Sequence, residues 1–509
     1  MSDPSYQPSG IPHYDGNPLI EALPPILTHD EAVRQMKHFP AYDKEHRTLP
    51  DHLRFHMIQC GLRFFTPLPV HTDLERRFSC LIRGGYSGRN PLRAAFRSET
   101  EQRLNALGDS RFIPPHVWST CSGFSIIGMS GIGKTRAVES ILNLYPQVIF
   151  HNRYRDRDFT HSQIVWLKLE CPYDGSPRGI CTNFFQSVDR ILGTTYRKNF
   201  AKDRRLPDEM MVDMANIATQ HSIGVLVIDE IQRLSRAKSG GAGKLLDFFV
   251  QLINLIGVPV VLIGTYKALS ILSREFSQIR RGTGQGDLIW DRMEEDEIWR
   301  LFVKSLWKYQ YTREVCSLTP KLSHALYEET QGITDFAVKV YMLAQVRAIT
   351  SKKEAITTGI IRSVARDSLR TAVRVLNAIR KRDNEVLAEY DDIPIIDFEK
   401  YLNQEINPPT SQETLSLPPE KTDKEDAPAS GNQQSGIAAS SDSADPQTQA
   451  EEIRKVDRSG PSGTRRKPGL RIPKGELPKI VLEAAVTQDL DAYNALRQAG
   501  HIRPSSEYL

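Results

Sequence analysis

The sequence predicts an α/β fold in which a parallel nucleotide-binding sheet is flanked by helices and followed by a small helical lid. Three observations lead to this prediction. A glycine-rich segment from Gly128 to Thr135 has the spacing G-x-x-x-x-G-K-T and joins an apolar strand to a helix. Apolar runs then alternate with helical patterns from residue 121 to about 290, as in a sheet buried on both faces. From about 293 to 382 only helical patterns occur.

The elements of the sheet region follow from this alternation. The first strand leads directly into the glycine-rich loop, and the loop leads into the first helix. All expected strands except the second are continuous apolar runs. The expected strands are Phe124–Gly128, Gln163–Glu170, Ile223–Asp229 and Val258–Gly264, and the expected helices are Thr135–Leu144, Ile180–Leu192 and Lys244–Ile256.

Helix boundaries in the lid region are indicated by capping residues. Thr319 precedes Pro320, which is the pattern of an N-cap followed by proline at the first helical position. Gly332 fits a C-terminal stop. Thr334 is expected to cap a strongly apolar helix, and a further helix is expected after Thr357.

The glycine-rich loop predicts a site for ATP and Mg²⁺. Its glycines allow backbone N–H groups to surround phosphate oxygens, and the positive end of the next helix faces the same anion. We expect Lys134 to reach the β- and γ-phosphates and the Thr135 hydroxyl to bind Mg²⁺. The predicted nucleotide-binding residues of this loop are Gly128, Met129, Ser130, Gly131, Ile132, Gly133, Lys134, Thr135 and Arg136.

Two further strand ends are expected to complete this site. The apolar strand before Asp229 and Glu230 ends in two acids, so we expect Asp229 to hold Mg²⁺ and Glu230 to polarise the attacking water. Thr265 follows a strand that should lie between the other two motif strands, and its hydroxyl could contact the γ-phosphate. The alternative for Thr265 is a hydroxyl that only caps the next turn.

Composition sets limits on the class of protein. The chain has 509 residues, of which 39% are hydrophobic, and its net charge of +4 is so small that any DNA-binding surface must be local. No C-x-x-C pair, signal peptide or apolar run of about 20 residues is visible, so a cytoplasmic location is expected.

Changes in composition divide the chain into five expected regions. The ends are expected to bind partners, because residues 19–27 form an apolar patch and Thr487–Ala499 has an apolar face after a basic stretch. The alternative for the C-terminal end is a solvated tail. The regions are an N-terminal extension (1–110), the nucleotide-binding domain (111–292), the lid and following helices (293–406), a disordered linker rich in Pro, Ser, Gly and Gln (407–463) and a basic tail (464–509).

The motifs together resemble the initiator-like branch of the AAA+ ATPases, and more closely the TnsC family of transposition regulators. The resemblance covers roughly residues 15–380 and is most specific in the N-terminal segments. The segments that carry it are 19–25, 82–91, the glycine-rich loop with 145–148, 225–232, 256–260, 262–265, 280–282, 331–332, 338–339 and 343–345.

The resemblance implies an ATPase that forms rings or helical oligomers on duplex DNA and links a target-selecting protein to a transposase. Arg280 or Arg281 would then reach the ATP of a neighbouring subunit; a solvated basic turn is the alternative. Many AAA+ proteins carry a nucleotide-sensing arginine near the start of a lid helix, where this chain has the acid Asp335, and Lys339 is the nearest cation.

DNA contacts are expected in regions that follow the DNA backbone in initiator-like ATPases. Arg155, Ser176 and Arg178 occupy those regions here, although each could equally be a solvated surface residue. The sequence thus predicts an ATP-hydrolysing, DNA-bound regulator of transposition. Two alternatives remain open: a signalling or defence ATPase that switches protein contacts without DNA, and a helicase loader.

Overall fold

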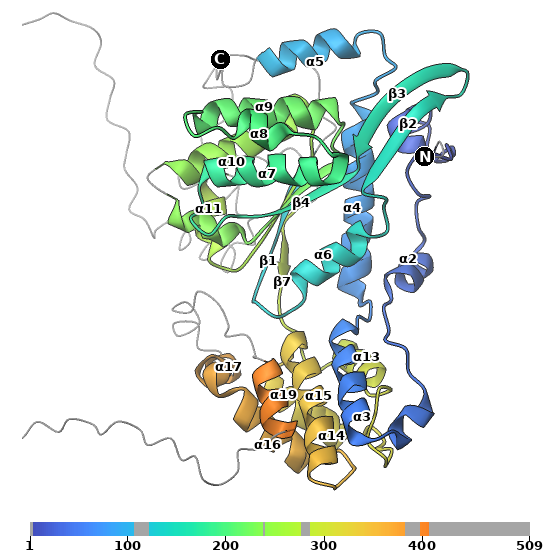
Figure 1. Ribbon diagram of the computed structural model, residues 1–509, viewed down its shortest axis with the longest axis vertical. Coiled ribbons are helices and arrows are strands. Elements are labelled where there is room, and N and C mark those ends of the chain that lie inside the picture. Colours follow the sequence, from blue (N-terminus) through green and yellow to red (C-terminus); the bar gives the residue numbers. More distant parts are fainter. Residues whose placement is uncertain (1–3, 106–121, 238–239, 276–285, 382–397, 407–509) are drawn as a thin grey trace, which may run out of the picture. The chain divides into compact units, whose positions relative to one another are not determined.

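The computed structural model describes residues 4–105, 122–237, 240–275, 286–381 and 398–406, which all belong to one compact unit, Met1–Leu417 (Figure 1). The expected linker (407–463) and tail (464–509) lie outside the described residues, as do Arg280 and Arg281. Among the described residues, no helix has the length and apolar character needed to cross a membrane.

Five parallel strands form the central sheet, which confirms the predicted fold class. Every residue of the three central strands β5, β6 and β1 is buried, which explains their apolar character in the sequence. The strand that precedes Thr265 lies between the two motif strands, as predicted. The strands are β1 (Gly123–Gly128), β4 (Trp166–Glu170), β5 (Val225–Asp229), β6 (Val260–Gly264) and β7 (Leu288–Trp290), in the order β4-β5-β6-β1-β7.

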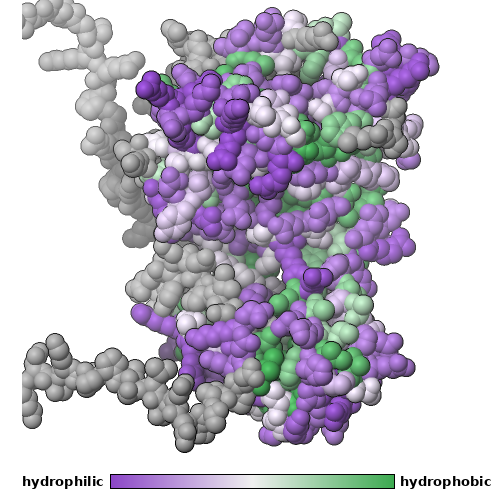
Figure 2. Space-filling model, viewed as in Figure 1, coloured by the Kyte–Doolittle hydropathy of each residue, from purple (hydrophilic) through white to green (hydrophobic). Residues whose placement is uncertain are grey.

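Helices cover both faces of this sheet (Figure 1). One face packs against α7 (Pro177–Leu192), α9 (Pro207–Gln220) and α10 (Gly241–Gln251). The outer sides of α7 and α9 are largely hydrophilic (Figure 2). The opposite face packs against α4 (Pro69–Ser87) and α6 (Lys134–Leu142). Shorter elements on the connections are α8 (Tyr196–Phe200), η3 (Ile231–Arg236), the π-helix η4 (Leu252–Ile256) and α11 (Ala268–Glu275).

An antiparallel hairpin, β2 (Val148–Tyr154) and β3 (Arg157–Ile164), was not expected from the sequence. The single strand expected over Gln163–Glu170 is therefore wrong: its first residues belong to β3 and its last to β4. Buried and exposed positions alternate along the first part of β2, up to a register shift between His151 and Arg153, which is the period of a ribbon with one solvated face. The buried position His151 is polar, and this hides the alternation from a count of apolar residues.

The N-terminal segment packs on its own chain. Leu19 and Ile20 of α1 (Pro18–Glu21) are fully buried against the core that includes α4. The side chain of Asn17 donates a hydrogen bond to the carbonyl of Tyr86 (2.8 Å). The apolar patch that was expected to dock on a partner is thus used largely inside the molecule. Further N-terminal elements are α2 (His29–Met36), η1 (Lys44–Thr48), α3 (Asp51–Gln59), η2 (Cys60–Arg63) and α5 (Phe96–Asn105).

The described chain after the sheet forms a helical domain. The hydroxyl of Thr319 caps α14, as predicted, and a helix follows Thr357, as predicted; the Thr357 hydroxyl also caps that helix, α16. Thr334, in contrast, does not cap α15; Ile333 holds the N-cap position and Thr334 is the first helical residue. The helices are α13 (Glu297–Leu306), α14 (Pro320–Thr330), α15 (Thr334–Thr350), α16 (Thr358–Ser368), η5 (Arg370–Ala372), α17 (Val373–Lys381) and α19 (Phe398–Ile406).

The N-terminal helix α3 belongs to the core of this helical domain rather than to that of the sheet. A buried guanidinium strengthens the contact: Arg54 is fully buried and donates to both carboxylate oxygens of Glu354, each at 2.8 Å. Arg54 also pairs with Asp51 at 2.6 Å. Hydrogen bonds from Lys352 and Arg54 lower the pKa of Asp51 to about 2. The N-terminal extension is therefore tied to the lid by an ion-pair network that has the buried Arg54–Glu354 pair at its centre.

Replacing Arg54 by methionine should lower the free energy of unfolding by about 3–5 kcal/mol, because Glu354 would remain buried without its partner. The folded-state pKa of Asp51 is lowered from 3.8 to about 2. Part of the difference in unfolding free energy between the wild type and Arg54→Met should therefore vanish as the pH falls from about 4 towards 2, where Asp51 takes up a proton. Chemical denaturation between pH 7 and pH 2.5 measures both effects. Arg313→Met is the matched control: Arg313 lies near the same carboxylates but is more than half exposed, so it should cost about 1 kcal/mol or less.

Candidate nucleotide site

The glycine-rich loop connects β1 to α6 in the geometry of a phosphate-binding loop. Gly131 and Gly133 have φ values of 78° and 98°, which side-chain-bearing residues rarely adopt. Gly128 has no space for a side chain, since a Cβ there would lie 2.0 Å from the carbonyl oxygen of Trp290. The backbone path and the close approach of Trp290 thus favour glycine at these three positions.

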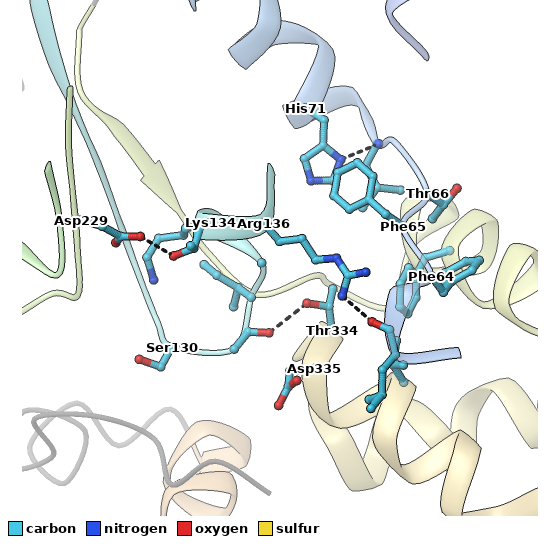
Figure 3. A pocket seen from close by; sticks show the side chains of 18 of the residues that line it. Phe64, Phe65, Thr66, His71, Ser130, Lys134, Arg136, Asp229, Thr334 and Asp335 are labelled. Atoms are coloured by element: carbon cyan, nitrogen blue, oxygen red, sulfur yellow. Dashed lines mark hydrogen bonds between the residues drawn. The ribbon is translucent and has the colours of Figure 1, made fainter. Parts of the chain in front are cut away.

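Lys134 and Thr135 begin α6 and line a cavity of about 360 Å³. Figure 3 shows Lys134 among the side chains that line it. The ammonium of Lys134 donates to the carbonyls of Gly128 (2.9 Å) and Met129 (2.7 Å). The hydroxyl of Thr135 donates to Oδ2 of Asp229 at 2.9 Å. The two motifs, which are far apart in the sequence, therefore meet through a direct hydrogen bond.

Asp229 and Glu230 lie at the carboxyl end of β5 and line the same cavity. Oδ1 of Asp229 accepts the backbone N–H of Glu230 at 2.8 Å. The backbone of Glu230 is left-handed (φ 60°), a conformation that is uncommon outside glycine. Its carboxylate accepts from Gln232 (3.1 Å) and pairs with Arg233 (3.3 Å). The side chains of Gln232 and Arg233 therefore hold the Glu230 carboxylate in place.

Thr265 lies at the end of β6 and also lines the cavity. Its hydroxyl is buried and has no hydrogen-bond partner in the described chain. Its backbone N–H donates to Oε1 of Gln232 at 3.2 Å, so Gln232 contacts both Thr265 and Glu230. A buried hydroxyl without a partner is costly, and a ligand oxygen in the cavity would satisfy it.

One wall of the cavity is apolar and was not predicted from the sequence. Its side chains come from the segment before α4 and from the lid, and a wall of this kind suits a planar base. His71 lies beside it; burial lowers the pKa of His71 to about 4, so the ring is neutral at pH 7. No motif marks these residues, and only their apolar character could have drawn attention to them. The wall consists of Leu62, Phe64, Phe65, Leu68, Phe302 and Val338.

The lid contacts the phosphate-binding loop directly (Figure 3). The hydroxyl of Thr334 and the backbone N–H of Asp335 both donate to the carbonyl of Gly131, at 2.9 Å and 3.0 Å. Asp335 in turn accepts from Lys339 at 2.8 Å. Arg136 lines the cavity and donates to the carbonyl of Leu62 at 2.6 Å, and burial lowers its pKa.

The donor set of this cavity fits Mg²⁺ and a nucleoside triphosphate. Mg²⁺ prefers oxygen ligands, and the Thr135 hydroxyl and the Asp229 carboxylate lie within 2.9 Å of each other. Lys134 supplies a cation beside the loop. The unpartnered hydroxyl of Thr265 supplies a donor for a phosphate oxygen.

The residues expected to contact DNA are not part of the cavity, and all three have partners in this chain. Arg155 pairs with Glu21 at 3.1 Å, although its own side chain remains 64% exposed. Ser176 caps α7 by accepting from the N–H of Gly179. Arg178 donates to the carbonyls of Lys202 and Arg205, both at 2.7 Å. Ser176 and Arg178 thus have structural contacts that the sequence did not reveal.

Comparison with known proteins supports the class of this domain. A family model described as an AAA domain matches residues 118–272. Together with the sheet order and the site geometry, this match shows that the chain contains an AAA-type P-loop ATPase domain with the AAA+ fold. A search of curated proteins gave no significant match.

Several solved structures of low identity also align with the chain. ORC2 of Aeropyrum pernix in ADPNP–ADP complexes is 12% identical over 62% of this chain and 85% of its own, with a TM-score of 0.33. ORC1 of the same organism in complex with DNA is 14% identical over 63% and 84%, with a TM-score of 0.34. The RuvB Holliday junction branch migration motor of Thermotoga maritima is 16% identical over 60% and 87%, with a TM-score of 0.29.

Thr265→Val should leave the melting temperature unchanged or slightly higher, because it removes a buried hydroxyl that has no hydrogen-bond partner among the residues that the structure describes. ATP turnover should fall by about 100-fold, the typical cost of removing one donor to a developing charge. Differential scanning calorimetry and a phosphate-release assay measure the two effects. Normal turnover would remove Thr265 from the site, and a large loss of stability would show that its hydroxyl has a partner inside the protein.

Proposed function

We propose that this chain binds ATP with Mg²⁺ in the cavity at the ends of β1, β5 and β6 and hydrolyses the ATP. The observation that carries the proposal is the convergence of Lys134, Thr135, Asp229 and the unpartnered Thr265 hydroxyl on one cavity. Glycines with positive φ supply the backbone curvature for the phosphates. The apolar wall accommodates the base.

Each of these residues has a role in the proposed reaction. Lys134 leaves the carbonyls of Gly128 and Met129 to neutralise phosphate oxygens, and Thr135 and Asp229 hold Mg²⁺, which when bound neutralises charge on the phosphates. Glu230 orients and polarises the attacking water. Because Glu230 is paired with Arg233 in this structure, its release from Arg233 precedes hydrolysis in the proposed cycle.

We further propose that ATP drives assembly on duplex DNA and that the protein is a cytoplasmic transposition regulator of the TnsC kind. Support comes from the TnsC-like segments outside the generic ATPase motifs, 19–25 and 82–91. These segments pack on each other, since Arg83 donates to the carbonyl of Pro24 at 2.6 Å. Segment 82–91 also reaches the residues that lead into β5, since Arg89 donates to the carbonyl of Ile223 at 2.8 Å. A nucleotide-dependent change in the ATPase domain could thus reach the N-terminal region.

The partners of the proposed assembly are duplex DNA, further copies of this chain, a target-selecting protein and transposase subunits. Arg155 is the strongest of the three DNA candidates, because its side chain is largely exposed. Arg280 or Arg281 would act on the ATP of a neighbouring copy. The N-terminal region would bind the target selector, through surfaces other than the buried Leu19 and Ile20.

Assembly on DNA should depend on an intact nucleotide site. Lys134→Ala should abolish nucleotide-dependent rings or filaments, whereas Glu230→Gln should bind ATP and accumulate them, because hydrolysis no longer removes them. Negative-stain electron microscopy with duplex DNA, with and without ATP, measures both. Lys321→Ala, on the exposed side of α14, is the matched control and should behave as the wild type.

The same experiment without DNA, and with a replicative helicase added, separates the alternatives, and a phosphate-release assay tests the role of Glu230. Assembly with ATP but without any need for DNA would contradict the transposition proposal and favour a signalling ATPase. Assembly that requires a replicative helicase would favour a helicase loader. Normal ATP turnover by Glu230→Gln would remove Glu230 from the proposed catalytic role.

Removal of residues 454–509 should prevent recruitment of transposase subunits to the DNA-bound protein, because this basic region carries the proposed partner-binding tail. Pull-down of transposase on immobilised DNA measures recruitment. ATP-dependent assembly of the truncated protein should be unchanged, which serves as the control. Undiminished recruitment would show that the tail is not the contact.

A further inference from the structure

A lysine outside the nucleotide-binding motifs lies against the carboxylate that is proposed to hold Mg²⁺. Lys168 is in β4, and its ammonium is 3.5 Å from Oδ2 of Asp229. The same ammonium contacts Oε1 of Glu139, on α6, at 2.5 Å. Lys168 thus lies between the proposed metal ligand and a second carboxylate.

The pairing of β4 with β5 explains why Lys168 reaches this position. Lys168 is opposite Val227, two residues before Asp229, so it projects from the same face of the sheet and reaches Asp229 diagonally. The side chains of Lys168 and Asp229 are 16% and 5% exposed, whereas that of Glu139 is 52% exposed. The contact with Asp229 is therefore largely shielded from solvent, and the contact with Glu139 lies nearer the surface.

Both oxygens of Asp229 are already engaged in this arrangement. Oδ1 accepts the backbone N–H of Glu230, and Oδ2 accepts the Thr135 hydroxyl at 2.9 Å. Lys168 approaches Oδ2, the oxygen that faces the second proposed metal ligand. A cation in this place compensates the buried negative charge of Asp229, and it repels a second cation that approaches the same oxygen.

We propose that Lys168 is a tethered competitor of Mg²⁺: it balances the charge of Asp229 when no metal is bound, and it withdraws from Asp229 and keeps only its contact with Glu139 when Mg²⁺ enters with the nucleotide. This proposal rests on the proposed ATP and Mg²⁺ site and adds a control on its metal affinity. Lys168 acts through Asp229 and is a positioning residue. Glu139 provides the alternative partner that allows the ammonium to leave Asp229.

Removal of Lys168 and removal of its partner Glu139 should have opposite effects on the affinity for Mg²⁺. A charge within about 4–6 Å commonly changes the proton affinity of a neighbouring group about 10-fold or more, and we expect an effect of that order on Mg²⁺. Lys168→Met should lower the Mg²⁺ concentration at half-maximal binding of a fluorescent ATP analogue about 10-fold. Glu139→Gln should raise that concentration, because the ammonium loses its alternative partner. Lys168→Arg keeps the charge and should stay close to the wild type.

The readout is a Mg²⁺ titration of analogue binding by the full chain, together with its melting temperature without nucleotide. An unchanged Mg²⁺ midpoint in Lys168→Met, with normal analogue binding, would overturn the inference and leave the proposed function intact. Loss of analogue binding in a folded Lys168→Met protein would also overturn it, since Lys168 would then serve the nucleotide itself. If Lys168→Met does not fold, a lowered midpoint in Glu139→Gln contradicts the inference. Failure of the wild type to bind the analogue would instead overturn the proposed function.

Discussion

The carbonyl oxygen of Gly131 accepts the hydrogen bonds that join the phosphate-binding loop to the lid. It belongs to the phosphate-binding loop, yet it accepts hydrogen bonds from the Thr334 hydroxyl and the Asp335 backbone N–H, both at the start of lid helix α15. Gly131 has a positive φ, a backbone conformation that favours glycine. A change in the loop conformation on nucleotide binding would therefore alter these two hydrogen bonds to the lid.

The N-terminal extension reinforces this connection from the other side of the cavity. Its helix α3 is held in the core of the helical domain by Arg54, and helix α4 packs on the sheet. The segment between them supplies the apolar wall of the cavity, including Phe64 and Phe65. One continuous stretch of chain thus contacts the lid, supplies much of the apolar wall and packs on the sheet. This arrangement explains how the state of a nucleotide could reach the N-terminal region.

The sequence was most informative where backbone chemistry leaves few alternatives. The loop from Gly128 to Thr135 requires a strand before it and a helix after it. The central strands are buried on both faces, so their continuous apolar runs allowed their positions to be predicted. The hairpin was missed because its buried positions include the polar His151. The apolar wall, the Thr334 contact and the position of Lys168 depend on tertiary packing between segments distant in sequence, which single-sequence periodicity does not carry.

Hydrogen–deuterium exchange of the full chain with and without ATP and Mg²⁺ tests the central claim that one nucleotide site joins the loop to the lid. We expect residues 128–136 and the start of α15 to become protected together, because the Gly131 carbonyl links them. The apolar wall around Phe64 should be protected in the same experiment. Protection confined to the loop, with no change in α15, would contradict the claim that the lid responds to the nucleotide through this contact.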